Sequence, residues 1–318
     1  MKRIRLLALV MVFAMLFCLV SCGEKEDVYT VGICQLVQHP ALDAATEGFK
    51  QALKDKLGDK VVFDEKNASN DINACATIAN GFVAKNVDLV LANATPALQA
   101  MAAATTTIPI LGTSVTEYGV ALGIENFNGT VGGNISGTSD LAPLDGQANM
   151  IKELCPDAKK IGLVYCSAEP NSLYQVKEIK RILESFGLTA TLFPCSDSND
   201  LAAVTEAACA ASDALYIPTD NTIANAAEIV DGITRREKIT VIAGEEGICS
   251  ACGAATLAIS YYDLGYKTGE MAAQILTGEK KISEMPIEYA PNAIKEYNEA
   301  VCKELGITIP DGYKKIGG

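Results

Sequence analysis

Two stretches of this chain repeat one pattern at an offset of about 130 residues. Residues 28–57 contain an apolar strand ending in VGICQ, a polar loop and a helix, and residues 160–186 repeat this order after the apolar strand IGLVYC. In both expected helices, apolar residues recur at spacings of three and four, which is typical of a helix with one buried face. The sequence therefore predicts that the two halves of the chain have the same order of strands and helices.

Each repeat continues into two further apolar strands. These are residues 87–92 and 108–111 in the first half, and residues 214–217 and 239–242 in the second. Strands with little polar alternation are buried on both faces, and strands that alternate with helices at this spacing form parallel sheets. We therefore predict an α/β fold of two similar Rossmann-like lobes with parallel sheets, joined by a multi-strand hinge.

The boundary between the repeats is a segment rich in Gly, Ser and Asn. Residues 132–143 (GGNISGTSDLAP) lack apolar periodicity, so we expect a crossover and hinge there. Residues 254–276 are expected to form a strand and a helix that returns to the first lobe, and residues 292–305 a last helix, capped by Asn292, on the second lobe. The expected lobes are residues 28–138 with about 250–284, and residues 139–249 with about 285–318.

The N-terminus combines a positively charged start, an apolar run at residues 6–20 and the sequence LVSC at residues 19–22. The apolar run is about fifteen residues, fewer than the roughly twenty that cross a bilayer as a helix, so it predicts a signal peptide. Its end resembles the bacterial lipobox. This resemblance implies a signal peptide at residues 1–21, a lipid on Cys22, a tether at residues 22–27 and a location at the extracytoplasmic face of the cell membrane. The alternative is an ordinary signal peptide with a chance cysteine, and both interpretations predict export.

Charge and cysteine content narrow the possible functions. The formal net charge is −13, and it is near −16 without the three basic residues of the expected signal peptide. Such a polyanion repels phosphate backbones, so nucleic-acid binding is not expected. Beyond Cys18 and Cys22, nine cysteines remain, and we interpret most of them as free thiols in the core.

Cys249 and Cys252 form a C-x-x-C motif. Such a motif alone is compatible with a redox site, half of a zinc site or no function. Because no second C-x-x-C and no histidine lies near it in the sequence, we expect no structural metal. We also expect no cofactor.

Polar residues gather where the expected strands end. In open parallel sheets, ligands bind outside the carboxyl ends of the strands. If the lobes face each other, these residues converge on a cleft that closes on a small solute. They are Gln35, Thr95 and Ser114 in the first half, and Glu169, Asn171, Asp220 and Glu245 in the second.

With these elements placed, several sequence runs resemble one family. The resemblance is to substrate-binding lipoproteins of ABC importers with the type I periplasmic-binding-protein fold, in the branch that includes tryptophan-binding and other aromatic-amino-acid-binding proteins. It implies capture of a solute, an amino acid with an aromatic side chain above all, for delivery to permease and ATPase subunits, and we expect a monomer. The runs are VGICQLVQHPALDAATEGF at 31–49, NATPALQA at 93–100, GTSVTEYG at 112–119, PTDNTIAN at 218–225 and GEEGI at 244–248.

An amino acid needs separate partners for its carboxylate and its ammonium. Thr95 precedes Pro96, a favourable first residue of a helix, so its hydroxyl and nearby backbone N–H groups are candidates for the carboxylate, with Ser114 and Thr116 as further donors. Asp220, at the equivalent strand end of the second half, is the candidate for the ammonium, which would let the ligand bridge both lobes. The alternatives are that Thr95 only caps a helix and that Asp220 is a turn residue.

Further candidates lie on the same loops. Gln35 and His39 follow the first strand, and His39 is interpreted as a turn or lid residue. Tyr165, near the end of the strand in the second repeat, is a candidate for the pocket wall. The remaining candidates, each of which is alternatively a solvated loop residue, are Glu169, Asn171, Asn221 and Glu245.

An exported hydrolase is the alternative from another class, with Cys34 and His39 as nucleophile and base. No orienting acid, G-x-S-x-G or H-E-x-x-H motif accompanies this pair, so we expect a protein that is not an enzyme. A ligand-sensing lipoprotein and a nucleoside or sugar ligand are open alternatives. Sugar sites usually stack rings on tryptophan, which this chain lacks.

Overall fold

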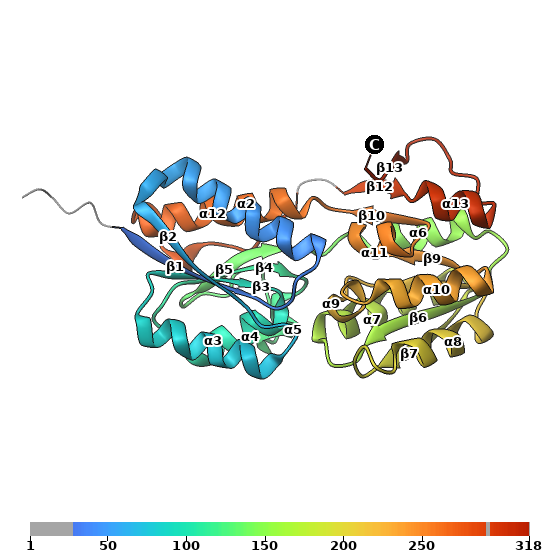
Figure 1. Ribbon diagram of the computed structural model, residues 1–318, viewed down its shortest axis with the longest axis horizontal. Helices are drawn as coiled ribbons and strands as arrows, with labels where there is room; N and C mark the ends of the chain where they lie inside the picture. The colour runs from blue at the N-terminus through green and yellow to red at the C-terminus, as the bar shows by residue number, and fades with distance from the viewer. Residues whose placement is uncertain (1–27, 291–292, 318) are drawn as a thin grey trace, which may run out of the picture.

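The computed structural model describes residues 28–290 and 293–317, which form two lobes side by side along the long axis of the molecule (Figure 1). The expected signal peptide, the tether and the lipidation site Cys22 lie outside the described residues. Each lobe is a sheet with helices on both faces, so the predicted α/β fold of two similar lobes is confirmed. Among the helices described, none is long and apolar enough to cross a bilayer.

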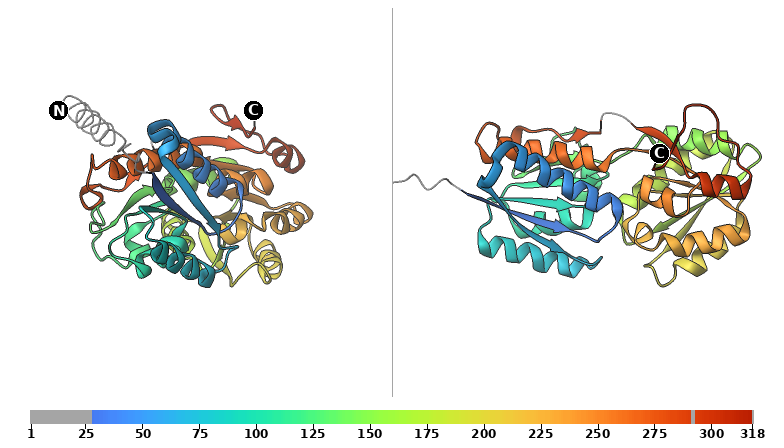
Figure 2. Two further views of the ribbon diagram at one scale, coloured as in Figure 1. Left: turned by 60° about the vertical axis from the view of Figure 1, so that its left-hand side comes forward. Right: turned by 45° about the horizontal axis from the view of Figure 1, so that its top comes forward.

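The sheet of the first lobe has six described strands, and all neighbouring strands are parallel. α3 (Ile72–Lys85) and α4 (Thr95–Ala104) pack on one face, and α2 (Pro40–Leu57) and α12 (Tyr261–Leu276) pack on the other (Figure 2). A short helix, α5 (Tyr118–Leu122), follows the fourth strand. In sheet order the strands are β11 (Glu288–Tyr289), β5 (Ile135–Ser139), β4 (Ile110–Val115), β3 (Leu89–Asn93), β1 (Tyr29–Gln35) and β2 (Val61–Asn67).

The sheet of the second lobe has seven described strands, and only β10 and β12 pair in antiparallel fashion. In sheet order the strands are β13 (Lys314–Lys315), β12 (Ile294–Tyr297), β10 (Ala255–Ala258), β9 (Thr240–Ala243), β8 (Ala214–Ile217), β6 (Lys160–Cys166) and β7 (Thr189–Cys195). One face packs on α6 (Leu144–Leu154) and α7 (Pro170–Ser185). The other face packs on α8 (Leu201–Ala211), α10 (Ala227–Glu237) and α11 (Glu246–Ala251), and α9 (Asn221–Ala224) is a single turn after β8.

The central strands are buried because their apolar residues face helices on both sides. Every residue of β3, β4 and β8 is buried. In α2, the buried face includes Leu42, Ala45, Phe49 and Leu53, the spacing of three and four that predicted an amphipathic helix. The two sheets therefore hold their carboxyl-terminal loops on rigid cores.

The lobe boundaries differ from the expected ones at two of the crossovers. β10 pairs with β9 in the second sheet, so the chain returns to the first lobe after Ala258 and not near residue 250. β11 pairs with β5 in the first sheet, so the chain leaves that lobe after Tyr289 and not near residue 284. Both differences have the same reason. The lobe of such a strand is determined by the strand with which it forms hydrogen bonds, and the sequence does not show which strand that is.

The expected last helix over residues 292–305 is wrong in its first part. Residues 294–297 form β12, and α13 (Glu299–Leu305) begins only after Asn298, whose side chain accepts hydrogen bonds from the backbone N–H groups of Ala300 and Val301. Asn298 therefore caps this helix, whereas the expected cap Asn292 lies outside the described residues. α13 packs on the second lobe, where Val301 and Cys302 contact Ala254.

α2 and α12 pack closely through small residues. A Cβ added at Gly265 would lie 1.9 Å from the carbonyl oxygen of Ala45, and one at Gly48 would lie 2.1 Å from the carbonyl oxygen of Tyr262. No heavy atom of a side chain fits at these distances, so glycine allows the two backbones to approach. This contact holds α12 on the first lobe although the strand before it belongs to the second.

We predict that Gly265→Ala destabilises the protein by about 1–3 kcal/mol, because the backbones of α2 and α12 must separate. Gly232→Ala is the matched control, since an added Cβ there, on the exposed side of α10, has no heavy atom within 4 Å. The control should be neutral or stabilising by about 0.5–1 kcal/mol from helix propensity. Urea unfolding measures both, and equal free energies of unfolding for the two variants would contradict the close packing.

Candidate functional site

The two lobes contact each other at the carboxyl ends of their strands. His39, after β1, has its Nε2 3.3 Å from Oδ1 of Asn221, the first residue of α9. Asn70, after β2, donates from Nδ2 to Oγ1 of Thr222 at 3.2 Å. Because open α/β sheets bind ligands beyond these strand ends, the interlobe region is the candidate site.

Buried polar atoms without a hydrogen-bond partner mark this region. Of the seven such side-chain atoms among the described residues, six lie at or just beyond the carboxyl ends of strands. Each unsatisfied atom costs about 1–3 kcal/mol, so native proteins satisfy nearly all of them. Their concentration on facing loops indicates where a polar ligand supplies partners. The six are His39 Nδ1, Asn93 Oδ1, Thr95 Oγ1, Ser114 Oγ, Asp140 Oδ1 and Asn171 Oδ1.

Thr95 and Ser114 stand at the ends of neighbouring strands, β3 and β4, and are 2% and 5% exposed. The backbone beside them is strained, with φ of 91° at Ala94 and 55° at Ser114, values that non-glycine residues adopt rarely. Thr95 is the first residue of α4 and Pro96 the second, so the positive end of this helix and its free N–H groups lie beside the hydroxyl. This corner of the first lobe is suited to an anionic group.

Glu169, a predicted ligand-binding residue, holds the loop of the second lobe instead of pointing free into the cleft. Its carboxylate accepts hydrogen bonds from the backbone N–H groups of Asn221 and Thr222 at 3.1 and 2.8 Å. The Asn221 amide and the Thr222 hydroxyl also donate to it, at 2.6 and 2.8 Å. Asn171 donates to the same carboxylate through Nδ2 and keeps its Oδ1 without a partner.

Asp220 has both carboxylate oxygens engaged. Oδ1 accepts from the backbone N–H of Ile223 at 2.9 Å, and Oδ2 accepts from that of Cys166 at 2.7 Å. Burial, together with the nearby negative charge of Glu169, raises the pKa of Asp220 well above its usual range. The contacts are those of a helix cap that also ties α9 to the end of β6.

Asp140 and Tyr261 are candidate site residues that the sequence analysis missed. Asp140 follows β5, accepts a hydrogen bond from the Tyr261 hydroxyl at 2.9 Å through Oδ2, and leaves Oδ1 without a partner. Burial raises the pKa of Asp140, while the hydroxyls of Tyr261 and Thr116 favour its charged form. The sequence offered one indication of Asp140, since it is the one charged residue in the segment 132–143. That segment was interpreted only as a hinge.

Three further residues that were predicted to bind ligand have contacts with other parts of the protein. The Gln35 amide donates to Val37 O and Asp43 Oδ1 at 2.9 and 2.6 Å, so it is occupied by the loop after β1 and the first turn of α2. Tyr165 belongs to the hydrophobic cluster between the second sheet and α7. Thr116 is buried beside Asp140, and its carbonyl oxygen accepts from the Ser139 hydroxyl at 2.8 Å.

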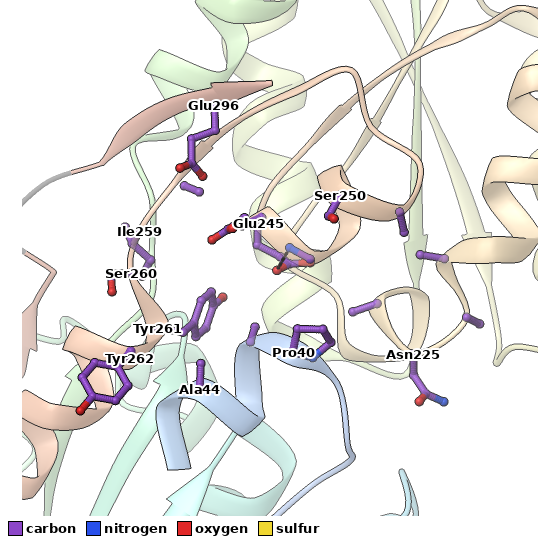
Figure 3. Close-up of a pocket in the computed structure, with 18 of the residues that line it drawn as sticks. Pro40, Ala44, Asn225, Glu245, Ser250, Ile259, Ser260, Tyr261, Tyr262 and Glu296 are labelled. Atoms are coloured by element: carbon purple, nitrogen blue, oxygen red, sulfur yellow. Dashed lines mark hydrogen bonds between the residues drawn. The ribbon is translucent and has the colours of Figure 1, made fainter. Parts of the chain in front are cut away.

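A groove of about 860 Å³ adjoins the site. Figure 3 shows it between the start of α2, the loops and helices that follow β8 and β9, and the start of α12. Of the residues predicted to bind ligand, only Glu245 lines it, and Tyr261 links it to Asp140. Glu245 caps α11 by accepting from the backbone N–H groups of Gly247 and Ile248, and burial raises the pKa of Glu245 to about 7.

The site contains four buried acids without a basic partner in the described part of the chain. Asp140, Glu169, Asp220 and Glu245 are each at most 4% exposed. In the described part of the chain, no lysine or arginine forms an ion pair with any of them. Buried charges are normally paired. The arrangement therefore favours a group with positive charge near these acids.

Two lobes with mostly parallel sheets, three changes of lobe in the order of the described strands and polar groups on facing strand ends define a binding protein of the type I periplasmic-binding fold. The chain belongs to the family of ABC transporter substrate binding proteins, whose sequence profile matches residues 30–316.

Known proteins of this kind resemble the chain over most of its length. It is 38% identical to a tyrosine-binding protein of Clostridioides difficile (strain R20291) over 285 residues, which cover 89% of this chain and 82% of the relative. A Streptococcus pneumoniae protein solved in complex with L-Trp is 33% identical, with a TM-score of 0.85 over 89% of this chain and 96% of the other. The ligand-free, open structure of a Clostridium difficile substrate binding protein with adhesive properties is 37% identical, with a TM-score of 0.70 over 91% and 99%.

The TM-scores of these two structures do not follow their sequence identities. The open structure has the higher identity but the lower TM-score, 0.70 against 0.85 for the L-Trp complex. Since related lobes keep their internal fold, a lower score at higher identity points to a different angle between the lobes. The hydrogen bonds of His39 and Asn70 across the cleft agree with a closed arrangement of this chain.

We predict that acidification stabilises the ligand-free protein through Glu245. Its folded-state pKa of about 7 lies above its ordinary value of 4.5, so this contribution is fully present below about pH 4.5 and is lost as pH rises through 7. Between about pH 7.5 and pH 5.5, the free energy of unfolding should rise by about 1–3 kcal/mol more in the wild type than in Glu245→Gln.

Urea unfolding at both pH values measures this difference. Glu279→Gln is the control, because Glu279 is an exposed carboxylate after α12, and it should keep the pH response of the wild type. An identical response of Glu245→Gln and the wild type would contradict the elevated pKa.

Proposed function

We propose that this protein captures an amino acid with an aromatic side chain, such as tryptophan, phenylalanine or tyrosine, between its lobes and delivers it to ABC permease and ATPase subunits. The family supports the transport role. The tyrosine-binding relative and the relative solved with L-Trp support the choice of an aromatic ligand. The protein acts by binding and releasing its ligand, without catalysis.

The observation that carries the amino-acid proposal is the separation of charge across the cleft. The first lobe offers the hydroxyls of Thr95 at the start of α4 and Ser114 near the end of β4, and the second lobe offers the buried carboxylates of Glu169, Asp220 and Glu245. A fourth buried carboxylate, that of Asp140, lies at the crossover after β5. A zwitterion matches both sides, since its carboxylate takes the hydroxyls and the helix start while its ammonium compensates the acids. Each charge-assisted hydrogen bond contributes about 1.5–3 kcal/mol.

Nucleosides and sugars match this site less well. Both are neutral, so they leave the buried carboxylates uncompensated, at a cost that proteins usually avoid. A ligand-sensing lipoprotein would have the same pocket and differ only in its membrane partner.

We predict that the wild-type protein is stabilised by L-tryptophan, L-phenylalanine or L-tyrosine and not by glucose or adenosine. A ligand at a hundred times its dissociation constant adds about 2.7 kcal/mol, which should raise the melting temperature by about 5 °C or more. Thermal unfolding with each compound tests this, with the corresponding D-amino acids as controls. A rise in melting temperature with glucose or adenosine alone would agree with the family but would contradict the proposed aromatic amino acid as the ligand.

We also propose that the mature chain begins at a lipidated Cys22, which anchors it at the extracytoplasmic face. The support is the charged start, the short apolar run and LVSC at residues 19–22. A single acyl chain binds membranes weakly, so stable anchoring needs more than one chain.

We predict that Cys22→Ser abolishes anchoring, because the substitution removes the sulfur that would carry the lipid. Fractionation of cells should recover the wild type with membranes, and mass spectrometry should find its N-terminal peptide heavier than the unmodified sequence. Cys18→Ser is the matched control, because Cys18 lies in the segment that is removed. An unmodified N-terminus at another residue would leave export intact and exclude the lipid.

A further inference from the structure

Asp140 differs from the other buried acids of the site because one of its carboxylate oxygens accepts no hydrogen bond from the described residues. It is 3% exposed, its Oδ2 accepts from the Tyr261 hydroxyl, and its Oδ1, although the Thr116 hydroxyl lies near the carboxylate, accepts no hydrogen bond from the described residues. Glu169, Asp220 and Glu245 each have both carboxylate oxygens engaged by donors of the second lobe. Asp140 is therefore the acid best able to accept a new hydrogen bond.

The position of Asp140 connects it to the hinge. It lies between β5 and α6, where the chain first passes from one lobe to the other, and its backbone N–H donates to Val115 at the end of β4. Tyr261 is the first residue of α12, directly after the chain returns from β10. The hydrogen bond between the two side chains thus joins two separate crossovers.

Tyr261 also stands against the second lobe. It is 6% exposed, and the Thr219 side chain, in the loop before Asp220, lies beside its hydroxyl. Its hydroxyl is consequently surrounded by Asp140, by Thr219 and by the carboxylate of Glu245. In this setting the hydroxyl has one strong acceptor, Asp140, and it fixes the orientation of that carboxylate.

Resting on the amino-acid-binding function proposed above, we propose that Asp140 accepts the ammonium group of the ligand through Oδ1, in place of Asp220, and that Tyr261 is the positioning residue for this carboxylate. The ammonium then contacts the crossover itself, while the ligand carboxylate contacts Thr95 and Ser114 in the first lobe. Asp220 serves as the cap of α9, the role that its two backbone contacts describe.

The test compares one amino acid with its deaminated analogue. Isothermal titration calorimetry measures L-tyrosine and 3-(4-hydroxyphenyl)propanoate, which differ only by the ammonium, on the purified exported protein. The wild type should prefer L-tyrosine. Asp140→Asn keeps the shape of the side chain and removes its charge, so it should weaken L-tyrosine by roughly 10- to 100-fold while leaving the affinity for the analogue within a few-fold of the wild type.

Two further variants separate recognition from folding. Tyr261→Phe should reduce the preference for L-tyrosine several-fold without affecting the analogue, because only the orientation of Asp140 changes. Asp220→Asn removes a helix-capping carboxylate and should reduce the affinities for L-tyrosine and for the analogue by the same factor. The inference is overturned if Asp140→Asn weakens both ligands equally, or if Asp220→Asn alone removes the preference.

The outcome for the wild type keeps this inference separate from the proposed function. If the wild type binds none of the three aromatic amino acids, the proposed ligand is wrong. If the wild type prefers L-tyrosine over its analogue and Asp140→Asn retains that preference, the function holds and only the assignment of Asp140 fails. Thermal unfolding of each variant verifies that it is folded in the titration.

Discussion

The contact between the lobes depends on one buried carboxylate, that of Glu169. It holds the backbone and side chains of Asn221 and Thr222 through hydrogen bonds of 2.6 to 3.1 Å. These are the residues that meet His39 and Asn70 of the first lobe. Hydrogen bonds to a charged acceptor are about twice as strong as neutral ones, so the contact surface of the second lobe is fixed before the lobes meet.

The structure contains buried acids whose charged forms are unfavourable. Burial raises the pKa values of Asp140, Asp220 and Glu245, which means that their charged forms have lost solvation. Neutral hydrogen bonds across the cleft contribute about 0.5–1.5 kcal/mol each, whereas a buried charge without a partner costs several kcal/mol. A ligand with a positive charge reduces this cost only when the lobes surround it. Binding and closure consequently favour each other.

The sequence predicts the plan of the fold better than the details of the site. Apolar strands and helices at regular spacing determine two parallel sheets, and Thr95 and Ser114 are recognisable because they follow such strands. Asp140 is not recognisable in this way, because its role depends on Tyr261, which is 121 residues further along the chain and reaches it through a different crossover. The lobe to which β10 belongs depends likewise on pairing with β9, and a contact of this kind leaves no local pattern.

Selectivity in such a site comes from the groups that a wrong ligand leaves unpaired. The hydroxyls beside α4 and the free oxygen of Asp140 are buried whether or not a ligand satisfies them, so each costs the ligand-free protein free energy. A molecule lacking either the carboxylate or the ammonium fills the same space but leaves one side of the cleft without partners. Sites that hydrogen-bond a ligand group can reject the analogue lacking it by about 10⁴-fold or more. On the proposed assignment, these unpaired groups are the source of discrimination, and the place of Asp140 at a crossover makes that discrimination a condition for closing the lobes.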